Sequence, residues 1–224
     1  MAVDGALLAL AEAPTLRLYG WRPHAVSLGY FQSLADFEDL PSETPIVRRS
    51  TGGGAIHHGD ELTYSLAVDA ALLPKDLAAG YALLHDAIAR ALLDVGVCCE
   101  RATDGRMSAR PQDRWCFAHP VQGDLVTARG KLCGSAQRRE RGRVLHHGSL
   151  VLRRPQLTPF VAAVEDQVEL AEDVRRGLHE GFAREIGAAL SLEPSHGALR
   201  DAESARADEL ARDVFGAAAH LARR

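Results

Sequence analysis

The chain has 224 residues, of which 46% are hydrophobic and 25% are charged, and its formal net charge is −4. This length and composition are typical of a globular protein, and we expect one domain over residues 1–224 with no accessory domain at the C-terminal end. The slightly acidic balance excludes a broadly basic surface for nucleic acid or a membrane. Because the chain shows neither a long apolar run nor a basic signal pattern at its start, we expect a cytoplasmic protein.

The predicted elements mix strands and helices without strict alternation. Residues 3–12 have helical character, and residues 15–21 and 24–32 show the apolar pattern of two strands. Apolar residues recur every three or four positions over 77–97, which predicts the longest helix. The further expected elements are strands at 46–49, 61–68, 123–139 and 144–152 and helices at 178–190 and 201–216. This order favours an α+β fold over a doubly wound α/β fold.

A glycine-rich segment, "RRSTGGGAIHH" at residues 48–58, follows the predicted strand at 46–49. Its three successive glycines carry no Cβ atom, so the backbone can approach a ligand closely. The segment lacks the G-K-[ST] ending of a Walker loop and the spacing of a dinucleotide fingerprint. Taken alone, it is equally consistent with a tight turn between two strands.

The four cysteines are irregularly placed and include no C-x-x-C pair. We therefore expect reduced thiols rather than a disulfide framework. No histidine has a partner cysteine at a zinc-finger spacing, so no metal site is expected. Cys98 and Cys99 are interpreted as core residues, whereas Cys116, within "RWCFAHP", and Cys133 are candidate nucleophiles.

Several segments together resemble one known family. "LRLYGW", "SLGYFQ", the glycine-rich segment, "GKLCGSAQRR" and "HHGSL" resemble the lipoate–protein ligase and octanoyltransferase family, whose catalytic domain is related to biotin protein ligase. The family pattern R-R-x-x-G-G-G-x-[VI]-x-H is matched from Arg48 to His58, and a segment ending in G-S-A-Q is matched from Lys131 to Gln137. The resemblance covers nearly the whole chain. It implies an α+β domain with a mixed or antiparallel sheet flanked by helices.

The resemblance also implies a pocket for an octanoyl or lipoyl group. The glycine-rich segment would lie beside the acyl carbonyl and the thin chain beyond it, where each buried CH₂ group contributes roughly 0.8 kcal/mol. His57, His119 and His146 are interpreted as surface or lining residues rather than bases. The implied acyl- or substrate-binding residues are Arg49, Gly52, Gly53, Gly54, Ala55, Ile56, His58, Gly134, Ser135, Ala136, His147 and Gly148.

Two chemistries within the family differ in how the acyl group is activated. A ligase uses ATP and Mg²⁺ to make an acyl-adenylate, and the lysine matched by Lys131 holds carboxylate or phosphate oxygens. A transferase requires no cofactor, because a cysteine takes the octanoyl group as a thioester. Cys116 precedes Lys131 by 15 residues, and a cysteine followed by phenylalanine ahead of that lysine resembles the transferases of Gram-positive bacteria. We therefore expect Cys116 and Lys131 to be catalytic in an octanoyltransferase.

Alternatives to this interpretation remain open in the sequence. Cys116 is also consistent with a buried structural cysteine. Cys133 is two residues from Lys131 and is therefore expected on the same strand face, which makes it a rival nucleophile. An ATP-dependent lipoate–protein ligase and a non-catalytic acyl-binding module are the alternative functions.

The resemblance implies two protein partners. The expected donor is octanoyl-acyl carrier protein, and the expected acceptor is a lysine of a lipoyl carrier domain such as the glycine-cleavage H protein. The identities of both partners and the oligomeric state stay open. The basic segment "RRERGR" at 138–143 is either a solvated turn or a basic patch that attracts the acidic surface of a carrier protein.

Overall fold

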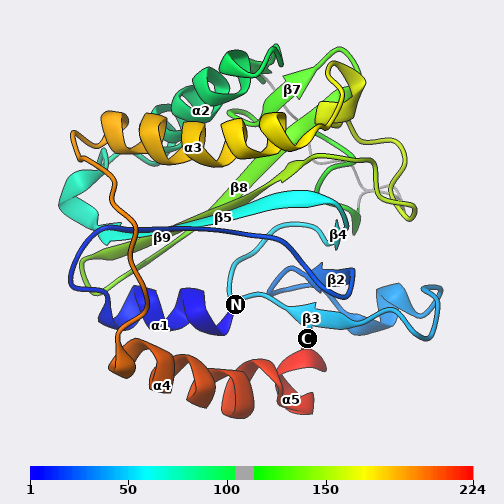
Figure 1. Cartoon of the computed structure of the whole chain (residues 1–224). Helices are drawn as coiled ribbons and strands as arrows, with labels where there is room; N and C mark the ends of the chain where they lie inside the picture. The colour runs from blue at the N-terminus through cyan, green and yellow to red at the C-terminus, as the bar shows by residue number, and fades with distance from the viewer. Residues whose placement is uncertain (104–113, 224) are drawn as a thin grey trace.

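The computed structural model describes residues 1–103 and 114–223, and its strands form two sheets (Figure 1). The larger sheet is antiparallel, in the order β1 (Thr15–Tyr19), β5 (Glu61–Asp69), β9 (Arg143–Val151), β8 (Gly130–Glu140), β7 (Leu125–Thr127) and β6 (Glu100–Arg101). The smaller sheet has the order β3 (Ile46–Arg48), β2 (Ala25–Leu28) and β4 (Ile56–His58). Here β2 runs parallel to β3 and antiparallel to β4.

Helices cover both faces of the larger sheet. On one face α2 (Leu77–Asp94) and α3 (Glu172–Ala189) lie side by side, and on the other α1 (Ala2–Leu10) packs with α4 (Asp201–Leu210) (Figure 1). The expected α+β fold, with an antiparallel sheet flanked by helices, is confirmed. The shorter helical elements are Leu34–Phe37, Ala70–Leu72, Val164–Asp166, the π-helical Ala211–Phe215 and α5 (Ala218–Leu221).

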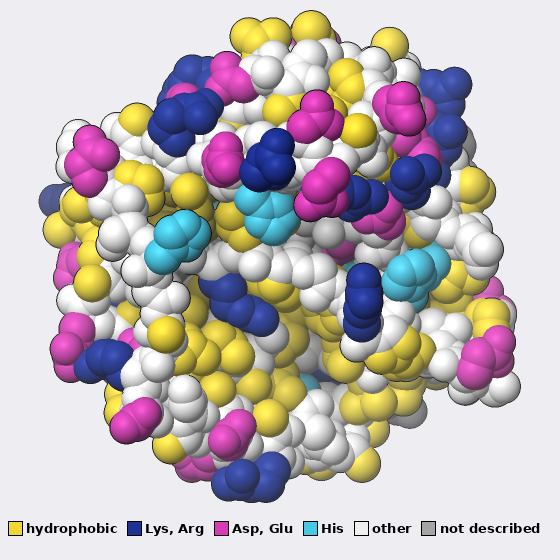
Figure 2. All heavy atoms as spheres, in the orientation of Figure 1, with side chains coloured by type: hydrophobic (Ala, Val, Ile, Leu, Met, Phe, Trp, Pro, Cys, Tyr) yellow, Lys and Arg dark blue, Asp and Glu magenta, His cyan; other side chains and the backbone are white. Residues whose placement is uncertain are grey.

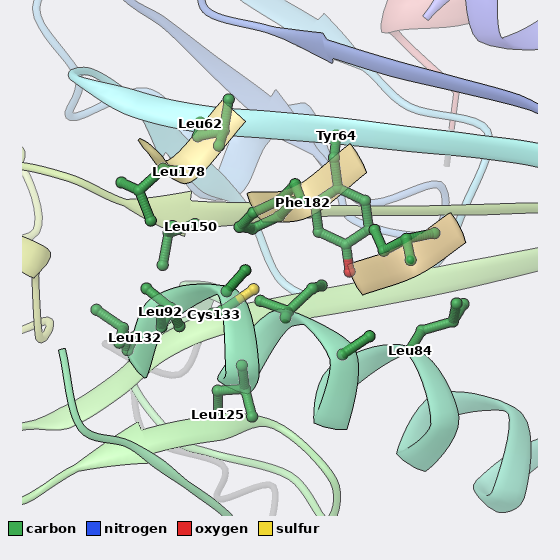
Figure 3. Packing of buried hydrophobic residues seen from close by; sticks show 14 of the residues in the cluster. Leu62, Tyr64, Leu84, Leu92, Leu125, Leu132, Cys133, Leu150, Leu178 and Phe182 are labelled. Atoms are coloured by element: carbon green, nitrogen blue, oxygen red, sulfur yellow. The ribbon is translucent and has the colours of Figure 1, made fainter. Parts of the chain in front are cut away.

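Side-chain alternation along β5 separates the core from the polar face of the sheet. Leu62 and Tyr64 are almost fully buried in the main hydrophobic core beneath α2 and α3 (Figure 3). Burial of such a leucine contributes about 2 kcal/mol. Glu61 and Thr63 point to the opposite face, because successive side chains of a strand alternate. The face without α2 and α3 therefore carries polar side chains.

The long helix α2 has local causes for both of its ends. The side chain of Asp76 accepts a hydrogen bond from the Ala79 amide at 2.7 Å, which caps the first turn. At the other end Gly96 has a φ angle of +84°, in the left-handed region that glycine adopts without a Cβ clash. The helix therefore stops at Asp94, three residues before the predicted end.

The single strand expected at 123–139 is instead a hairpin of β7 and β8. The chain reverses at residues 128–129, and Gly130 follows with a φ angle of +128°, which favours glycine. The prediction was wrong because it treated "TARGK" at residues 127–131, a polar segment with a glycine, as part of the strand rather than as the turn. The hairpin places Lys131 at the start of β8.

Charges of both signs are interspersed over the helices α2 and α3 (Figure 2). One pair joins the two helices, because Arg90 of α2 lies 2.7 Å from Glu185 of α3. Across residues 1–103 and 114–223, no helix combines the length and the apolar character needed to cross a membrane.

Candidate active site

A pocket of about 340 Å³ is lined by strands of both sheets and by the glycine-rich loop at 52–54. The larger sheet contributes β1, β5, β8 and β9, and the smaller contributes β2 and β4. Residues far apart in the sequence therefore meet at one cavity. The sequence-predicted residues that line it are Cys116, Lys131, Arg49, Gly52, Gly53, Gly54, Ile56, His58, Gly134, Ser135, Ala136, His147 and Gly148.

The glycine-rich loop holds the backbone of Cys116. Ala55 and Trp115 form a parallel bridge, in which the Ala55 amide donates to the Arg114 carbonyl at 2.7 Å and the Cys116 amide donates to the Ala55 carbonyl at 2.8 Å. A Cβ atom on Gly54 would lie 2.7 Å from the Cys116 nitrogen, so only glycine permits this approach. Ala55 is 1% exposed and is absent from the pocket lining, which corrects its expected place in the pocket wall.

Arg49 ties the loop to the smaller sheet. Its guanidinium donates to the carbonyls of Gly52 at 2.9 Å, Gly54 at 2.7 Å and Ser27 at 3.2 Å. Burial lowers the pKa of Arg49, and the nearby charge of Cys116 acts in the opposite direction. Arg49 therefore fixes the loop conformation and places a positive charge close to the cysteine.

Cys116 and Lys131 face each other inside the pocket. The Lys131 Nζ lies 3.5 Å from the Cys116 Sγ and 3.4 Å from the Cys116 carbonyl oxygen, and it pairs with Asp124 at 2.8 Å. Burial alone acts to lower the pKa of Lys131, but the charges of Cys116 and Asp124 outweigh it, and the net pKa is raised. Lys131 is thus a buried ammonium within 3.5 Å of the sulfur. Sequence reasoning missed Asp124, which belongs to none of the matched motifs.

The path of the Lys131 side chain depends on Gly134. A Cβ atom on Gly134 would lie 2.2 Å from the Lys131 Cε and 2.5 Å from its Nζ, so the lysine stem occupies the space that any side chain there would take. The Phe117 ring lies 5.0 Å from the Nζ and covers the ammonium. The "GKLCGSAQ" segment therefore supplies both the ammonium and the space for it.

Cys133 does not share a strand face with Lys131, which corrects the expectation from their spacing. Leu125 pairs with Cys133 and Val126 pairs with Lys131, so β8 carries one extra residue, a β-bulge. The bulge reverses the alternation, and Cys133 lies among leucines of the hydrophobic core with 0% exposure (Figure 3). Burial raises the pKa of its thiol well above the ordinary value. Cys133 is a core residue, and Cys116 is the thiol that lines the pocket.

His58 lies at the centre of a second polar cluster on the pocket wall. Its Nδ1 is 2.7 Å from the Glu61 Oε1, and its Nε2 is 2.7 Å from the Ser27 Oγ. The Trp21 ring stacks on the imidazole at 4.0 Å with an interplanar angle of 15°. Sequence reasoning missed Ser27, Glu61 and Trp21, although "HHGDE" places a carboxylate three residues after His58.

His147 meets the glycine-rich segment from the opposite strand. Its Nε2 lies 2.8 Å from the Thr51 Oγ1. Burial lowers the pKa of His147 to about 4, so the ring is neutral at physiological pH. A neutral, hydrogen-bonded imidazole positions the loop rather than contributing charge.

The remaining histidines, Cys98 and the basic segment agree only in part with their expected positions. His119 lines the pocket, whereas His146 is fully buried, contacts Tyr64 at 3.1 Å and is neither a surface nor a lining residue. Cys98 is exposed, not a core residue as expected. The segment 138–143 forms the β8–β9 hairpin turn, where Arg138 pairs with Glu140 at 2.9 Å.

Residues 1–193 match the model of the lipoyl protein ligase A/B catalytic domain. The match covers most of the chain and includes every residue of the pocket. The chain therefore belongs to the lipoyl protein ligase A/B catalytic domain family.

Named relatives and solved structures agree with this family. The octanoyltransferase LipM of Kyrpidia tusciae is 34% identical, over 92% of this chain and 88% of its own. The octanoyltransferase LipM of Halalkalibacterium halodurans is 30% identical, over 96% of this chain and 91% of its own. A bi-partite lipoate protein ligase from Thermoplasma acidophilum, solved with its E2 lipoyl domain, superposes with a TM-score of 0.73 at 21% identity, covering 100% of this chain and 91% of that one. This last likeness concerns the fold alone.

Proposed function

We propose that the chain is an octanoyltransferase of protein lipoylation that carries the octanoyl group on Cys116. It is an acyltransferase like its relatives of 34% and 30% identity, which are named octanoyltransferases. The observation that carries the role of Cys116 is the 3.5 Å separation of its Sγ from the buried Lys131 Nζ. The Asp124 carboxylate holds that ammonium in place at 2.8 Å.

The first half-reaction loads the enzyme. The Cys116 sulfur attacks the thioester carbonyl of the donor, a new C–S bond forms, and the donor thiol leaves. Lys131 stabilises the negative charge on the attacking sulfur. The apolar side chains of Trp21, Ile56 and Trp115 line the pocket, where each buried CH₂ group of the acyl chain contributes roughly 0.8 kcal/mol.

The second half-reaction transfers the group to a lysine amine of a lipoyl domain. The amine attacks the thioester on Cys116, a C–N bond forms, and the C–S bond breaks. The same ammonium of Lys131 stabilises the departing sulfur. Since both steps pass through a thioester, the proposal requires neither ATP nor Mg²⁺.

An acyl donor and a lipoyl-domain acceptor are the two partners of such a reaction. We propose octanoyl-acyl carrier protein as the donor and the glycine-cleavage H protein as one acceptor. Because the pocket is lined by strands of both sheets, each partner must present its reacting group into the cavity between them.

A transfer assay tests this proposal. Octanoyl-acyl carrier protein and apo-H protein are incubated with the chain, with and without ATP and Mg²⁺, and the mass of the H protein is measured. We expect octanoylation that does not depend on nucleotide. Activity only with ATP and a free fatty or lipoic acid would instead establish a ligase, and binding without turnover would establish an acyl-binding module. Cys116→Ser should abolish transfer, whereas Cys133→Ser, in the core, serves as the matched thiol control.

A further inference from the structure

In the Ser27–His58–Glu61 cluster, the donor and the acceptor of each hydrogen bond can be assigned. An ionised carboxylate only accepts hydrogen bonds, so the His58 Nδ1 carries the proton that Glu61 receives at 2.7 Å. The His58 Nε2 then accepts the hydrogen bond of the Ser27 hydroxyl at 2.7 Å. Thr63 and Ser149 donate to the same carboxylate, the latter at 2.7 Å, and fix its orientation. The cluster is arranged to receive a proton at Ser27 and to hold it on His58.

The cluster also connects two cavities. Ser27 and His58 line the pocket that contains Cys116. Glu61 lines a second cavity of about 950 Å³, whose wall includes the charged side chains of Arg22 and Arg175. Trp21 lines both cavities and stacks on the His58 ring between them. A proton taken from the pocket therefore has a polar route away from it.

The lysine acceptor must lose a proton before it can attack, because a free lysine side chain has a pKa of about 10.4. Lys131 is already an ammonium paired with Asp124, and Cys116 carries the acyl group at this stage. His147 is a weak base in this pocket, since burial lowers its pKa to about 4. His58 lines the pocket and has a carboxylate at hydrogen-bond distance that supports a positive charge on its ring.

We propose that Ser27, His58 and Glu61 form a proton relay that deprotonates the acceptor lysine in the second half-reaction. This inference rests on the proposed octanoyltransferase function. The acceptor ammonium gives one proton to the Ser27 oxygen while the Ser27 proton passes to the His58 Nε2. The free amine forms the C–N bond, the C–S bond breaks, and the second proton lost by the nitrogen goes to the Cys116 sulfur. The imidazolium then releases its proton to water in the second cavity. The relay requires the acceptor amine to reach the Ser27 hydroxyl, and His58 and Glu61 act through Ser27.

The ionisable groups around His58 are consistent with this role. Burial lowers the pKa of the neighbouring His57 and lowers that of His147 to about 4, which disfavours a positive charge on either ring. The other charged or titratable groups near His58 come from several elements. Glu61 of β5 contacts the ring directly, and Arg49 reaches it by way of the Ser27 hydroxyl. His57 of β4, His147 of β9 and, on the far side of Glu61, Tyr19 of β1 complete the set.

The chain offers a matched control histidine. The His85 Nε2 lies 2.7 Å from the hydroxyl of Ser135, another pocket residue, but its Nδ1 faces the Gly123 carbonyl at 2.5 Å. A backbone carbonyl carries no full charge to support an imidazolium, and burial lowers the pKa of His85. The two serine–histidine pairs therefore differ in the carboxylate.

The test loads Cys116 with an octanoyl group and then measures single-turnover cleavage by two nucleophiles. One is the lysine of an apo lipoyl domain, and the other is hydroxylamine, which is largely uncharged at neutral pH. In His58→Gln, whose amide retains hydrogen bonding, transfer to lysine at pH 7 should fall roughly 100-fold, while hydroxylamine cleavage stays within about threefold. Transfer to lysine should recover towards pH 9.5, where more of the acceptor amine is neutral. Ser27→Ala should give the same selective loss.

Two outcomes would overturn the relay. Equal slowing of the lysine and hydroxylamine reactions in His58→Gln and Ser27→Ala would show that Ser27 and His58 have a purely structural role. A selective loss of transfer to lysine in His85→Gln as well would show that the carboxylate beside His58 makes no difference. The loading step separates this inference from the proposed function. An unmodified protein that forms no octanoyl adduct at Cys116 refutes both, whereas a normal adduct with unselective variants refutes the relay alone.

Discussion

Gly54 and Cys116 are in direct backbone contact, and a Cβ atom on Gly54 would lie 2.7 Å from the Cys116 nitrogen. The two hydrogen bonds of the Ala55–Trp115 bridge lie beside this contact. The glycine-rich loop and the cysteine therefore form one rigid unit. In this account the third glycine serves the placement of the nucleophile as well as the shape of the pocket.

Gly54→Ala should therefore reduce octanoyl loading of Cys116 by at least roughly tenfold, because the added methyl group forces the bridge apart, at a cost of about 1–3 kcal/mol. Loading is measured by mass spectrometry of the intact protein, and stability by urea denaturation. Gly197→Ala is the matched control, since a Cβ atom there meets nothing within 4 Å. A folded Gly54→Ala protein that loads at the unmodified rate would contradict the coupling.

Lys131→Ala should slow alkylation of Cys116 at pH 7, because the ammonium 3.5 Å from the sulfur is lost. Alkylation is followed in a Cys98→Ser background, since Cys98 is exposed. The substitution leaves Asp124 buried without its partner and should cost about 3 kcal/mol of stability.

The double variant Lys131→Ala/Asp124→Asn restores neutrality and is the control for that loss. It should recover stability, while alkylation of Cys116 stays slow. Recovery of the unmodified alkylation rate in the double variant would show that Lys131 does not act on the thiol by its charge.

Arg48→Met should destabilise the fold by about 3 kcal/mol, because it leaves buried carbonyls without donors. The Arg48 guanidinium donates to Gly29 at 3.0 Å, Gln32 at 2.6 Å and Leu221 at 2.7 Å, among other carbonyls. It thus ties α5 to the segment after β2. Urea denaturation gives the magnitude, and Arg138→Met, at an exposed ion pair, should change stability by less than about 0.5 kcal/mol. Similar values for the two variants would contradict this structural role.

Acidification should destabilise the protein through His147. Its folded-state pKa of about 4 lies below the value of about 6.5 expected in the unfolded chain, so the unfolded state binds more protons between these values. Stability is therefore present above pH 6.5 and is lost as the pH falls towards 4. His147 accounts for about 2 kcal/mol between pH 7 and pH 5. His147→Gln should flatten the dependence of the unfolding free energy on pH by that amount, and an unchanged slope would contradict it.

The fold and much of the pocket could be predicted from the sequence, because strand alternation and the matched motifs are local signals. The pairing of Cys116 with Lys131 followed from the motif order, and the structure places the two groups in contact. Asp124 could not be foreseen, since a lone acid before a strand indicates nothing without the hairpin that brings it to Lys131. The same holds for Ser27 and Glu61, which meet at His58 only after the two sheets pack.

The mistaken prediction for Cys133 has a specific physical cause. A spacing of two residues places side chains on one face only in a regular strand. The bulge opposite Leu125 and Val126 adds a residue and reverses the alternation of side chains between the two faces of the sheet. The sequence "GKLCG" contains no signal that predicts this bulge. Ala55 was misplaced for a related reason, because its backbone pairs with Trp115, a partner from a distant segment.

The most direct test of the account is the mass of the protein after incubation with octanoyl-acyl carrier protein in the absence of nucleotide. The account predicts an increment of one octanoyl group, labile to hydroxylamine, that maps to Cys116, is absent in Cys116→Ser and forms more slowly in Lys131→Ala. An adduct that persists in Cys116→Ser, or no adduct in the unmodified protein while ATP and free octanoate support transfer, would contradict it.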